Sequence, residues 1–542
     1  MAMNFKEGRW NHEINVTDFV KTNITPYEGD ASFLVGPTER TKAVWNKCLE
    51  ALAEERANNG VRSLDPSTVS TITSFAPGYI DKENEVIVGL QTDEVLRRAI
   101  KPFGGIKVVE KACRENGVEV DPRVKDIFTH YRKTHNDGVF DAYTEEIRSF
   151  RSLGFLTGLP DNYARGRIIG DYRRLALYGL DRLIEAKQND LRHLTGPMTD
   201  ARIRLREEVA EQIKALKEIK IMGEQYGLEL GRPALNAQEA VQWVYMAYLA
   251  AVKEQDGAAM SLGNVSSFLD IYIEYDMAHG LLDEAHAQEL IDQFVIKLRM
   301  VRHLRMQAYT DIFAGDPTWV TESIGGRFND GRTKVTKTSF RFLQTLYNLG
   351  PSPEPNLTVL WSPELPEGFK NFCAQVSIDT SSIQYENDDL MREVRNSDDY
   401  GIACCVSYQD IGRHIQFFGA RCNLAKALLL AINGGRCENT GTLMVKGIPA
   451  LTSDVLNFEE VLANYKKVLK EMARVYNEAM NIIHYMHDKY YYEKAQMAFV
   501  DTDPAINLAY GVAGMSIAVD SLSAIKLSLI HISEPTRLLS IS

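Results

Sequence analysis

Residues 398–407 read Asp-Asp-Tyr-Gly-Ile-Ala-Cys-Cys-Val-Ser, and the run 402–407 has the apolar character of a short strand or loop. Its adjacent thiols, Cys404 and Cys405, are unusual, because random placement of seven cysteines predicts about 0.08 adjacent pairs. A disulfide between neighbours would be strained, since their Cα atoms lie only about 3.8 Å apart. Two thiols side by side suit the passage of an acyl group, a hydrogen atom or an electron pair between sulfurs. The alternative is that both are small buried hydrophobic residues.

On both sides of this doublet, strand-like runs alternate with helical patterns. LTVLWS at 357–362 is typical of a strand, and the charged stretch 201–220 has the apolar spacing of an amphipathic helix. Asn236 and Asn457 are each followed three residues later by Glu, the capping spacing of a helix start. The first 150 residues are predicted to form short helices and strands. The sequence therefore predicts a mixed α/β protein in which helices form the majority.

Composition excludes several classes of protein. The chain has 542 residues, of which 45% are hydrophobic and 25% charged, enough for a sizeable core. The net charge of -12 argues against binding to nucleic acid or to an anionic membrane. The apolar runs are much shorter than the roughly 18 residues of a membrane span. Few cysteines and a polar, charged start indicate a protein of the reducing cytoplasm.

Arginine and aromatic side chains recur in three further segments. Phe418 and Arg421 lie in the run QFFGARCN, where aromatic walls would dry an arginine that holds a carboxylate. Arg167 lies in a glycine-rich basic segment that could meet a small anion, and its alternative is a solvated turn. Phe313 and Trp319 precede a glycine pair and by themselves indicate core packing.

Other motifs point away from metal or nucleotide chemistry. His484 and His487 share one face of a predicted helix, but no third ligand is visible, so packing is favoured over a metal site. The sequence has no phosphate loop, no G-x-G-x-x-G after a strand, no H-E-x-x-H and no G-x-S-x-G. The sequence therefore disfavours four kinds of enzyme: nucleotide hydrolases, Rossmann-fold hydride-transfer enzymes, zinc proteases and serine hydrolases.

From Trp10 to Lys526 the chain resembles the pyruvate formate-lyases of the glycyl radical enzyme family. The doublet resembles this branch of the family, whereas related dehydratases usually present one cysteine. The resemblance implies a helix-rich α/β fold with a ten-stranded barrel of two half-sheets, which holds the cysteine loop and is surrounded by helices. The stretches that carry it include TPYEGD, FGGIK, YRKTHN, RGRIIGDYRR, TESIGG, PSPEPN, SIDTSSIQYENDDLMR, IACCVS and QFFGARCNLAKALLLAINGG.

The resemblance implies a formate C-acetyltransferase that cleaves pyruvate with coenzyme A by a thiyl-radical, ping-pong mechanism. Cys404 matches the cysteine that becomes acetylated, and Cys405 matches the cysteine that relays the radical. Two arginines match the residues that hold the substrate carboxylate, and three aromatic residues match the pocket walls: Arg167, Arg421, Trp319, Phe313 and Phe418.

The resemblance also implies the partners. Coenzyme A is a co-substrate, and no bound cofactor or metal is expected. A radical S-adenosylmethionine activating enzyme makes the glycyl radical in this family. The resemblance further implies a cytoplasmic homodimer in the fermentation of anaerobes, with no nucleic acid or membrane partner.

The sequence departs from the family at its end. The glycine loop, close to Arg-Val-Ser-Gly-Tyr-Ala in the family, does not occur in the printed residues. We expect residues 1–526 to be a catalytic domain that is incomplete at its C-terminus, 527–542 to be a foreign tail, and the glycine radical domain to be absent. The chain alone is then expected to be inactive, unless an autonomous glycyl radical protein docks onto it. The alternatives are a 2-ketobutyrate formate-lyase, another glycyl radical enzyme such as a dehydratase, or a catalytically dead binding chain.

Overall fold

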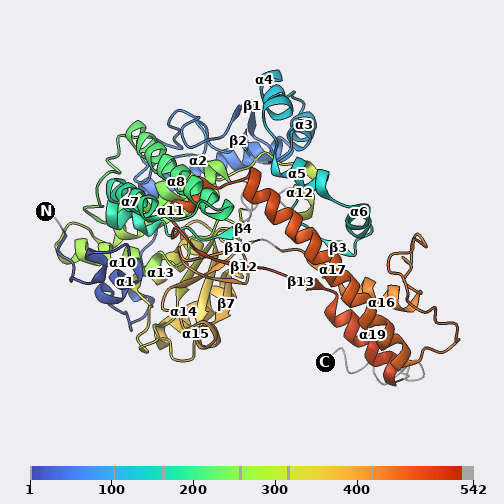
Figure 1. Ribbon diagram of the computed structural model, residues 1–542. Helices are drawn as coiled ribbons and strands as arrows, with labels where there is room; N and C mark the ends of the chain where they lie inside the picture. Colours follow the sequence, from blue (N-terminus) through green and yellow to red (C-terminus); the bar gives the residue numbers. More distant parts are fainter. Residues whose placement is uncertain are drawn as a thin grey trace. The chain divides into compact units, whose positions relative to one another are not determined.

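The computed structural model divides into two compact units, which are coloured by sequence in Figure 1. It describes residues 3–102, 104–161, 166–255, 259–313, 318–417 and 419–527, with the backbone alone at residues 166, 167, 312 and 313. The first unit comprises Met1–Arg132, Gly166–Gln416 and Tyr492–Asn507, and the second comprises Lys133–Arg165, Phe417–Tyr491 and Leu508–Ser542.

A helix that is apolar on all sides runs through the core of the first unit. This is α9 (Ala237–Glu254), in which all but two residues are buried. It begins where predicted, because the Asn236 side chain accepts a hydrogen bond from the Glu239 backbone N–H at 2.8 Å. Such a helix cannot lie at a surface, so other helices of this unit pack around it.

Long helices make up most of the first unit. The predicted amphipathic helix is confirmed as α8, whereas α2 is longer than the short elements expected of the first 150 residues. The helices are α1 (Val16–Asn23), α2 (Glu39–Ala57), α3 (Ile106–Glu115), α4 (Pro122–Asp126), α7 (Arg173–His193), α8 (Asp200–Gln225), α9, α10 (Ser266–Ala278), α11 (Glu284–Arg299), α12 (Gln307–Phe313), α13 (Lys337–Asn348), α14 (Glu367–Thr380), α15 (Asp388–Arg395) and α18 (Lys494–Met497), with short turns η1 (Arg9–Asn11), η2 (Ala31–Phe33) and η3 (Ile127–Tyr131).

Four small sheets lie among these helices. The three-stranded sheet β5-β6-β7 is parallel. Thr321 of β5 pairs with Asn356 of β6, and Trp361 of β6 pairs with Asn387 of β7. Within the described residues, backbone ladders do not join the sheets into one closed barrel. The strands are β1 (Ser63–Val69) with β2 (Arg97–Ile100), β5 (Thr321–Gly325) with β6 (Asn356–Trp361) and β7 (Ile383–Asn387), β8 (Tyr400–Ala403) with β9 (Ser407–Asp410), and β4 (Gly166–Ile168) with β10 (His414–Phe417) and β12 (Ala505–Leu508).

The second unit is built around the 33-residue helix α17 (Phe458–Tyr490), which Figure 1 shows beside α16 and α19. Its predicted start is confirmed, because the Asn457 side chain accepts from the Glu459 and Glu460 N–H groups. Apolar residues spaced three and four apart face the core. The other elements are α5 (His135–Ala142), α6 (Glu145–Ser152), β3 (Leu156–Thr157), β11 (Arg421–Asn423), α16 (Leu424–Ile432), β13 (Gly511–Ala513) and α19 (Met515–Leu527).

The two histidines of α17 pack inside the second unit, as their helical spacing favours. The His487 ring lies 4.6 Å from the His135 ring, and the His484 ring lies 4.6 Å from the Phe417 ring. Among the described side chains, no group of three or more His, Cys, Asp or Glu residues could hold a metal ion. No helix in the described part of the chain is long and apolar enough to cross a membrane.

A buried ion cluster attaches the β8–β9 hairpin to α7. The fully buried Arg173 guanidinium donates to Asp171 at 2.7 Å and to Asp399 at 2.8 and 3.0 Å. Burial acts to raise the pKa of Asp399, but Arg173, together with Thr17 and Lys334, holds this pKa below its ordinary value. Since Asp399 directly precedes β8, the cluster fixes where the hairpin leaves the core.

Replacing Arg173 with Met should destabilise the first unit by about 3–5 kcal/mol, because Asp171 and Asp399 would lose the buried guanidinium that both contact. Urea unfolding followed by tryptophan fluorescence measures this loss. The matched control is Arg332→Met, which removes a partly exposed pair with Asp330 and should cost less than about 1 kcal/mol. Equal losses in the two variants would contradict the anchoring role of Arg173.

Candidate active site

The two adjacent thiols lie at the tip of the β8–β9 hairpin. The strands pair antiparallel with Ala403 opposite Ser407, so Cys404, Cys405 and Val406 form the connecting turn. A continuous strand over 402–407 is therefore wrong, and the loop interpretation holds. The physical reason is the tight hairpin connection: Cys404 has φ 65°, a left-handed conformation that no strand contains.

The turn stores backbone strain at the thiols. A left-handed φ costs a residue other than glycine roughly 1 kcal/mol or more. Of the six such non-glycine residues in the described chain, Cys404 and Trp319 both belong to the predicted site. The surrounding contacts must hold these conformations in place, which makes the hairpin tip a functional candidate.

The two thiols have different environments. Cys404 is 8% exposed, whereas the Cys405 side chain is exposed, and neither cysteine forms a disulfide. One sulfur can therefore face a protected space while its neighbour remains accessible. The interpretation of both cysteines as buried hydrophobic residues does not hold for Cys405.

Side chains from the start of the parallel sheet hold the main chain of Cys404. Its carbonyl oxygen accepts from the Thr321 hydroxyl of β5 and from the Asn356 side-chain amide of β6, the latter at 3.3 Å. Its N–H donates to the Ser261 hydroxyl at 3.0 Å. These bonds compensate for the strain of the left-handed turn.

A second amide extends this arrangement to Cys405. The Gln384 side chain of β7 donates to the Cys405 carbonyl, and its own oxygen accepts from the Asn356 amide at 3.2 Å. All three strands of the sheet thus supply one donor near their first residues. Sequence reasoning missed these positioning residues, although Asn356 and Gln384 stand in the family-like runs PSPEPN and SIQYEN.

Trp319 is brought to the cysteine turn through a shared hydroxyl. The Ser261 hydroxyl, which accepts from Cys404 N–H, donates to the Trp319 carbonyl at 3.5 Å. The Trp319 ring packs edge-on against Tyr309 at 6.3 Å. The predicted aromatic wall residue and the predicted acetyl acceptor therefore share one support.

The other predicted site residues are placed less completely. Arg167 lies on β4, two residues before Ile169, which packs with Ala403 at the base of the turn. The side chain of Arg167 lies outside the described residues. The side chain of Phe313, the last residue of α12, and the whole of Phe418 also lie outside them. Arg421 belongs to the second unit, where its strand β11 pairs with β3 and β13 and its side chain is exposed.

A buried glutamate supports the loop that carries Ser261. Glu322 on β5 is fully buried, and its carboxyl group accepts the N–H groups of Val265 at 2.9 Å and Ser266 at 2.8 Å. Burial raises the pKa of Glu322 to about 8, although these two hydrogen bonds oppose the rise. This loop lies so close to the hairpin that a Cβ on Gly401 would be only 2.7 Å from the Gly263 Cα, so glycine is required at position 401.

Comparison with known proteins identifies the family. Residues 7–531 match the family described as pyruvate formate lyase-like. The chain belongs to this family. It is also 56% identical over 527 residues to the formate acetyltransferase of Haemophilus influenzae. This alignment covers 96% of this chain and 68% of the relative. The match to residue 531 passes the point at Lys526 where we expected the family pattern to end.

Solved structures confirm that this member of the family has the helix-rich α/β fold of glycyl radical enzymes. The B12-independent glycerol dehydratase of Clostridium butyricum matches with a TM-score of 0.75 at 19% identity, over 92% of this chain and 72% of that chain. A Roseburia inulinivorans protein of 1,2-propanediol dehydration matches with a TM-score of 0.73 at 17% identity, over 98% of this chain and 71% of that chain. A glycyl radical enzyme from Archaeoglobus fulgidus matches with a TM-score of 0.67 at 17% identity, over 94% of this chain and 71% of that chain.

Glu322→Gln should become relatively more stable than the wild type as the pH rises. A carboxyl group whose pKa is raised in the folded state stabilises the fold below its unfolded pKa, and this contribution is lost up to the folded pKa of about 8. Between about pH 5 and 8 the unfolding free energy of the wild type should fall relative to the variant by at most about 1.4 kcal/mol per pH unit. Denaturant titrations at several pH values measure the difference, and parallel pH curves would refute it.

Thiol labelling should distinguish the two cysteines of the turn. Iodoacetamide should modify Cys405 at least about tenfold faster than the fully buried Cys48, whose pKa burial raises to about 12. Cys404 should react more slowly than Cys405, because its side chain is mostly buried. Peptide mass spectrometry over a time course gives the rates. Faster labelling of Cys404 would contradict the exposures of the two side chains.

Proposed function

We propose that this chain carries out the chemistry of a formate C-acetyltransferase, which converts pyruvate and coenzyme A to acetyl-CoA and formate. The observation that carries the proposal is the pair of adjacent thiols, held at a strained turn by donors from three strands, in a chain 56% identical to a formate acetyltransferase. Adjacent sulfurs can exchange a hydrogen atom at little entropic cost.

The proposed first half-reaction leaves an acetyl group on the protein. The glycyl radical of the family supplies the unpaired electron that Cys405 relays to Cys404. The Cys404 thiyl radical adds to C2 of pyruvate, and the C1–C2 bond breaks to give an acetyl thioester on Cys404 and a carboxyl-derived radical. That radical takes the hydrogen atom of the Cys405 thiol and leaves as formate.

The second half-reaction is thiol exchange. The thiol of coenzyme A attacks the acetyl carbonyl, and acetyl-CoA leaves while the Cys404 sulfur recovers a proton. The structure supports this division of labour, since Cys404 is protected and Cys405 is exposed. Water would hydrolyse a thioester, so the burial of Cys404 favours its role as the acetyl carrier.

The remaining roles in the proposal come from the sequence resemblance. Arg167 and Arg421 hold the pyruvate carboxylate, which a guanidinium can bind in bidentate fashion. Trp319, Phe313 and Phe418 form the apolar walls. The finer proposal includes a radical S-adenosylmethionine activating enzyme, an autonomous glycyl radical protein as a further partner, a homodimer, and a cytoplasmic role in anaerobic fermentation.

The proposal predicts an acetyl group on Cys404. The chain is incubated anaerobically with pyruvate, the activating enzyme and a glycyl radical domain, either in the same polypeptide or added separately. Mass spectrometry should find acetyl-Cys404, and labelled formate should exchange into pyruvate without coenzyme A. Cys404→Ser and Cys405→Ser should each lower the exchange by at least about a thousandfold.

The matched control is Cys113→Ala, which removes a buried thiol from α3 and should leave the exchange within about twofold. If glycyl radical forms but neither acetyl-Cys404 nor exchange appears, the acetyltransferase proposal fails. If Cys404→Ser alone abolishes turnover and Cys405→Ser does not, a one-thiol reaction such as dehydration is favoured instead. Faster exchange with 2-ketobutyrate than with pyruvate would reassign the substrate.

A further inference from the structure

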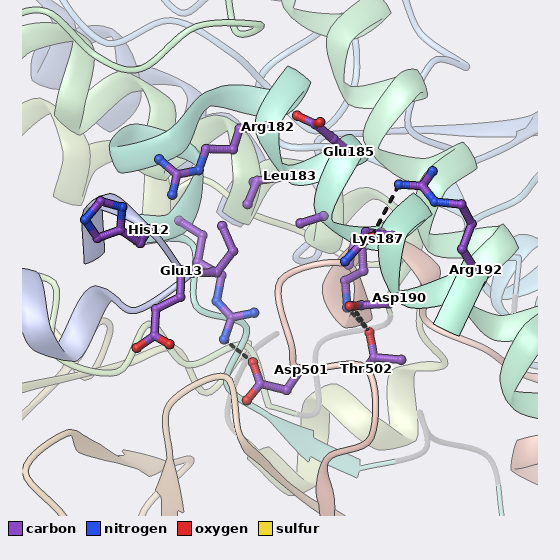
Figure 2. A pocket seen from close by; sticks show the side chains of 15 residues that line it. His12, Glu13, Arg182, Leu183, Glu185, Lys187, Asp190, Arg192, Asp501 and Thr502 are labelled. Atoms are coloured by element: carbon purple, nitrogen blue, oxygen red, sulfur yellow. Dashed lines mark hydrogen bonds and ion pairs between the residues drawn. The ribbon is translucent and has the colours of Figure 1, made fainter. Parts of the chain in front are cut away.

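The first unit contains a cavity of about 620 Å³ that the proposed acetyl transfer does not use. Its lining comes from α7, from residues 12–14 and from residues 498–502 (Figure 2). A volume of this size is ordinary for a small-molecule site. The lining contains both cationic and carboxylate side chains. Its electrostatic potential is therefore not uniformly positive, as a site for a simple anion would require.

A buried lysine amine borders this cavity. Lys187 of α7 is 6% exposed, and its Nζ donates to the Val500 carbonyl at 2.7 Å and to the Thr502 hydroxyl at 3.3 Å. The Thr502 hydroxyl in turn donates to the Asp190 carboxylate at 2.5 Å, and Figure 2 shows Lys187, Thr502 and Asp190 on one side of the cavity. A hydrogen-bonded path therefore connects the amine through a hydroxyl to a carboxylate.

The surroundings favour the neutral amine. Burial and the nearby Arg174 together lower the pKa of Lys187 to about 7, although Asp190 and Asp501 oppose this shift. With two protons donated to oxygens, the fourth tetrahedral position of a neutral amine is its lone pair. An ordinary lysine, with a pKa near 10.4, is almost entirely protonated at neutral pH and is a poor nucleophile.

We propose that Lys187 is an acylation site, which takes an acetyl group from a small acetyl thioester that enters this cavity. The proposal depends on the proposed function only for the cellular source of the thioester, because acetyl-CoA is the product of that reaction. The chemistry itself needs only the amine, the relay and the cavity.

The step balances without a further reagent. The amine lone pair attacks the acetyl carbonyl, a C–N bond forms, and the C–S bond breaks so that the thiolate leaves with the electron pair. The proton that the nitrogen loses passes to the Thr502 oxygen as the Thr502 proton passes to Asp190, and it then reaches the thiolate through solvent. The products are an amide on Lys187 and free coenzyme A.

Acetylation would disturb a segment that contacts the thiol-bearing hairpin. The amide can no longer donate to both Val500 and Thr502, and its added volume presses on this segment. Asp501 stands between Val500 and Thr502 in the sequence. Its N–H donates to the Gly412 carbonyl at 2.7 Å, and Gly412 lies in the turn that follows β9 of the hairpin. The site is thus placed to report the acetyl thioester level to the hairpin.

The test supplies acetyl-CoA to the purified chain at about pH 7.5, with no pyruvate and no activating enzyme. Peptide mass spectrometry follows the acetylation of each lysine. Lys187 should react at least about tenfold faster than Lys467, an exposed lysine of α17. Equal rates at the two lysines, or reaction at Lys187 only after denaturation, would overturn the proposal.

Two variants sharpen this result. Thr502→Val should slow the acetylation of Lys187 about tenfold while leaving Lys467 unchanged, and Lys187→Arg should abolish the corresponding peptide signal. Hydrogen exchange of residues 407–413 should increase in the acetylated chain, and unchanged exchange would refute the link to the hairpin. Because the donor is added from outside, a failure of the proposed acetyltransferase activity leaves this test valid.

Discussion

The chemistry of this chain depends on holding one strained residue still. Cys404 adopts a left-handed backbone at the tip of a hairpin, and an unsupported turn of this kind would relax. Donors from Ser261, Thr321 and Asn356 occupy its amide and carbonyl groups. Because peptide groups are rigid planes, fixing these atoms also fixes the direction of the Cα–Cβ bond of Cys404.

The supports themselves rest on buried ionisable groups, an arginine cluster and a carboxyl group with a raised pKa. Arg173 joins Asp171 and Asp399 at the base of the hairpin, and Glu322 holds the loop that carries Ser261. Charged groups in a low-dielectric core are costly unless their geometry is satisfied, so they tolerate few alternative arrangements. These groups therefore limit the positions that the base of the hairpin and the Ser261 loop can adopt.

Sequence patterns were most reliable where a local cause acts alone. The capping residues Asn236 and Asn457 mark the starts of α9 and α17, because an N-cap acts on the next few N–H groups. The strand at 357–362 is found as β6, one residue earlier at each end. For the run 402–407 the sequence left a strand and a loop open, since apolar β-branched composition does not reveal where a hairpin turns. The supporting role of Asn356 and Gln384 could not be inferred from local patterns, because their partners lie 48 and 21 residues away.

By itself, the sequence determined the family, the helix-rich α/β class and the identity of the two thiols, because these follow from residue types and their order. Only the tertiary structure decided that Cys404 is protected while Cys405 is exposed, and that Trp319 shares the Ser261 hydroxyl with Cys404. It also placed Lys187 against a cavity and a hydroxyl from a segment more than 300 residues away. Burial and hydrogen-bond geometry arise between distant segments, and no local pattern encodes them.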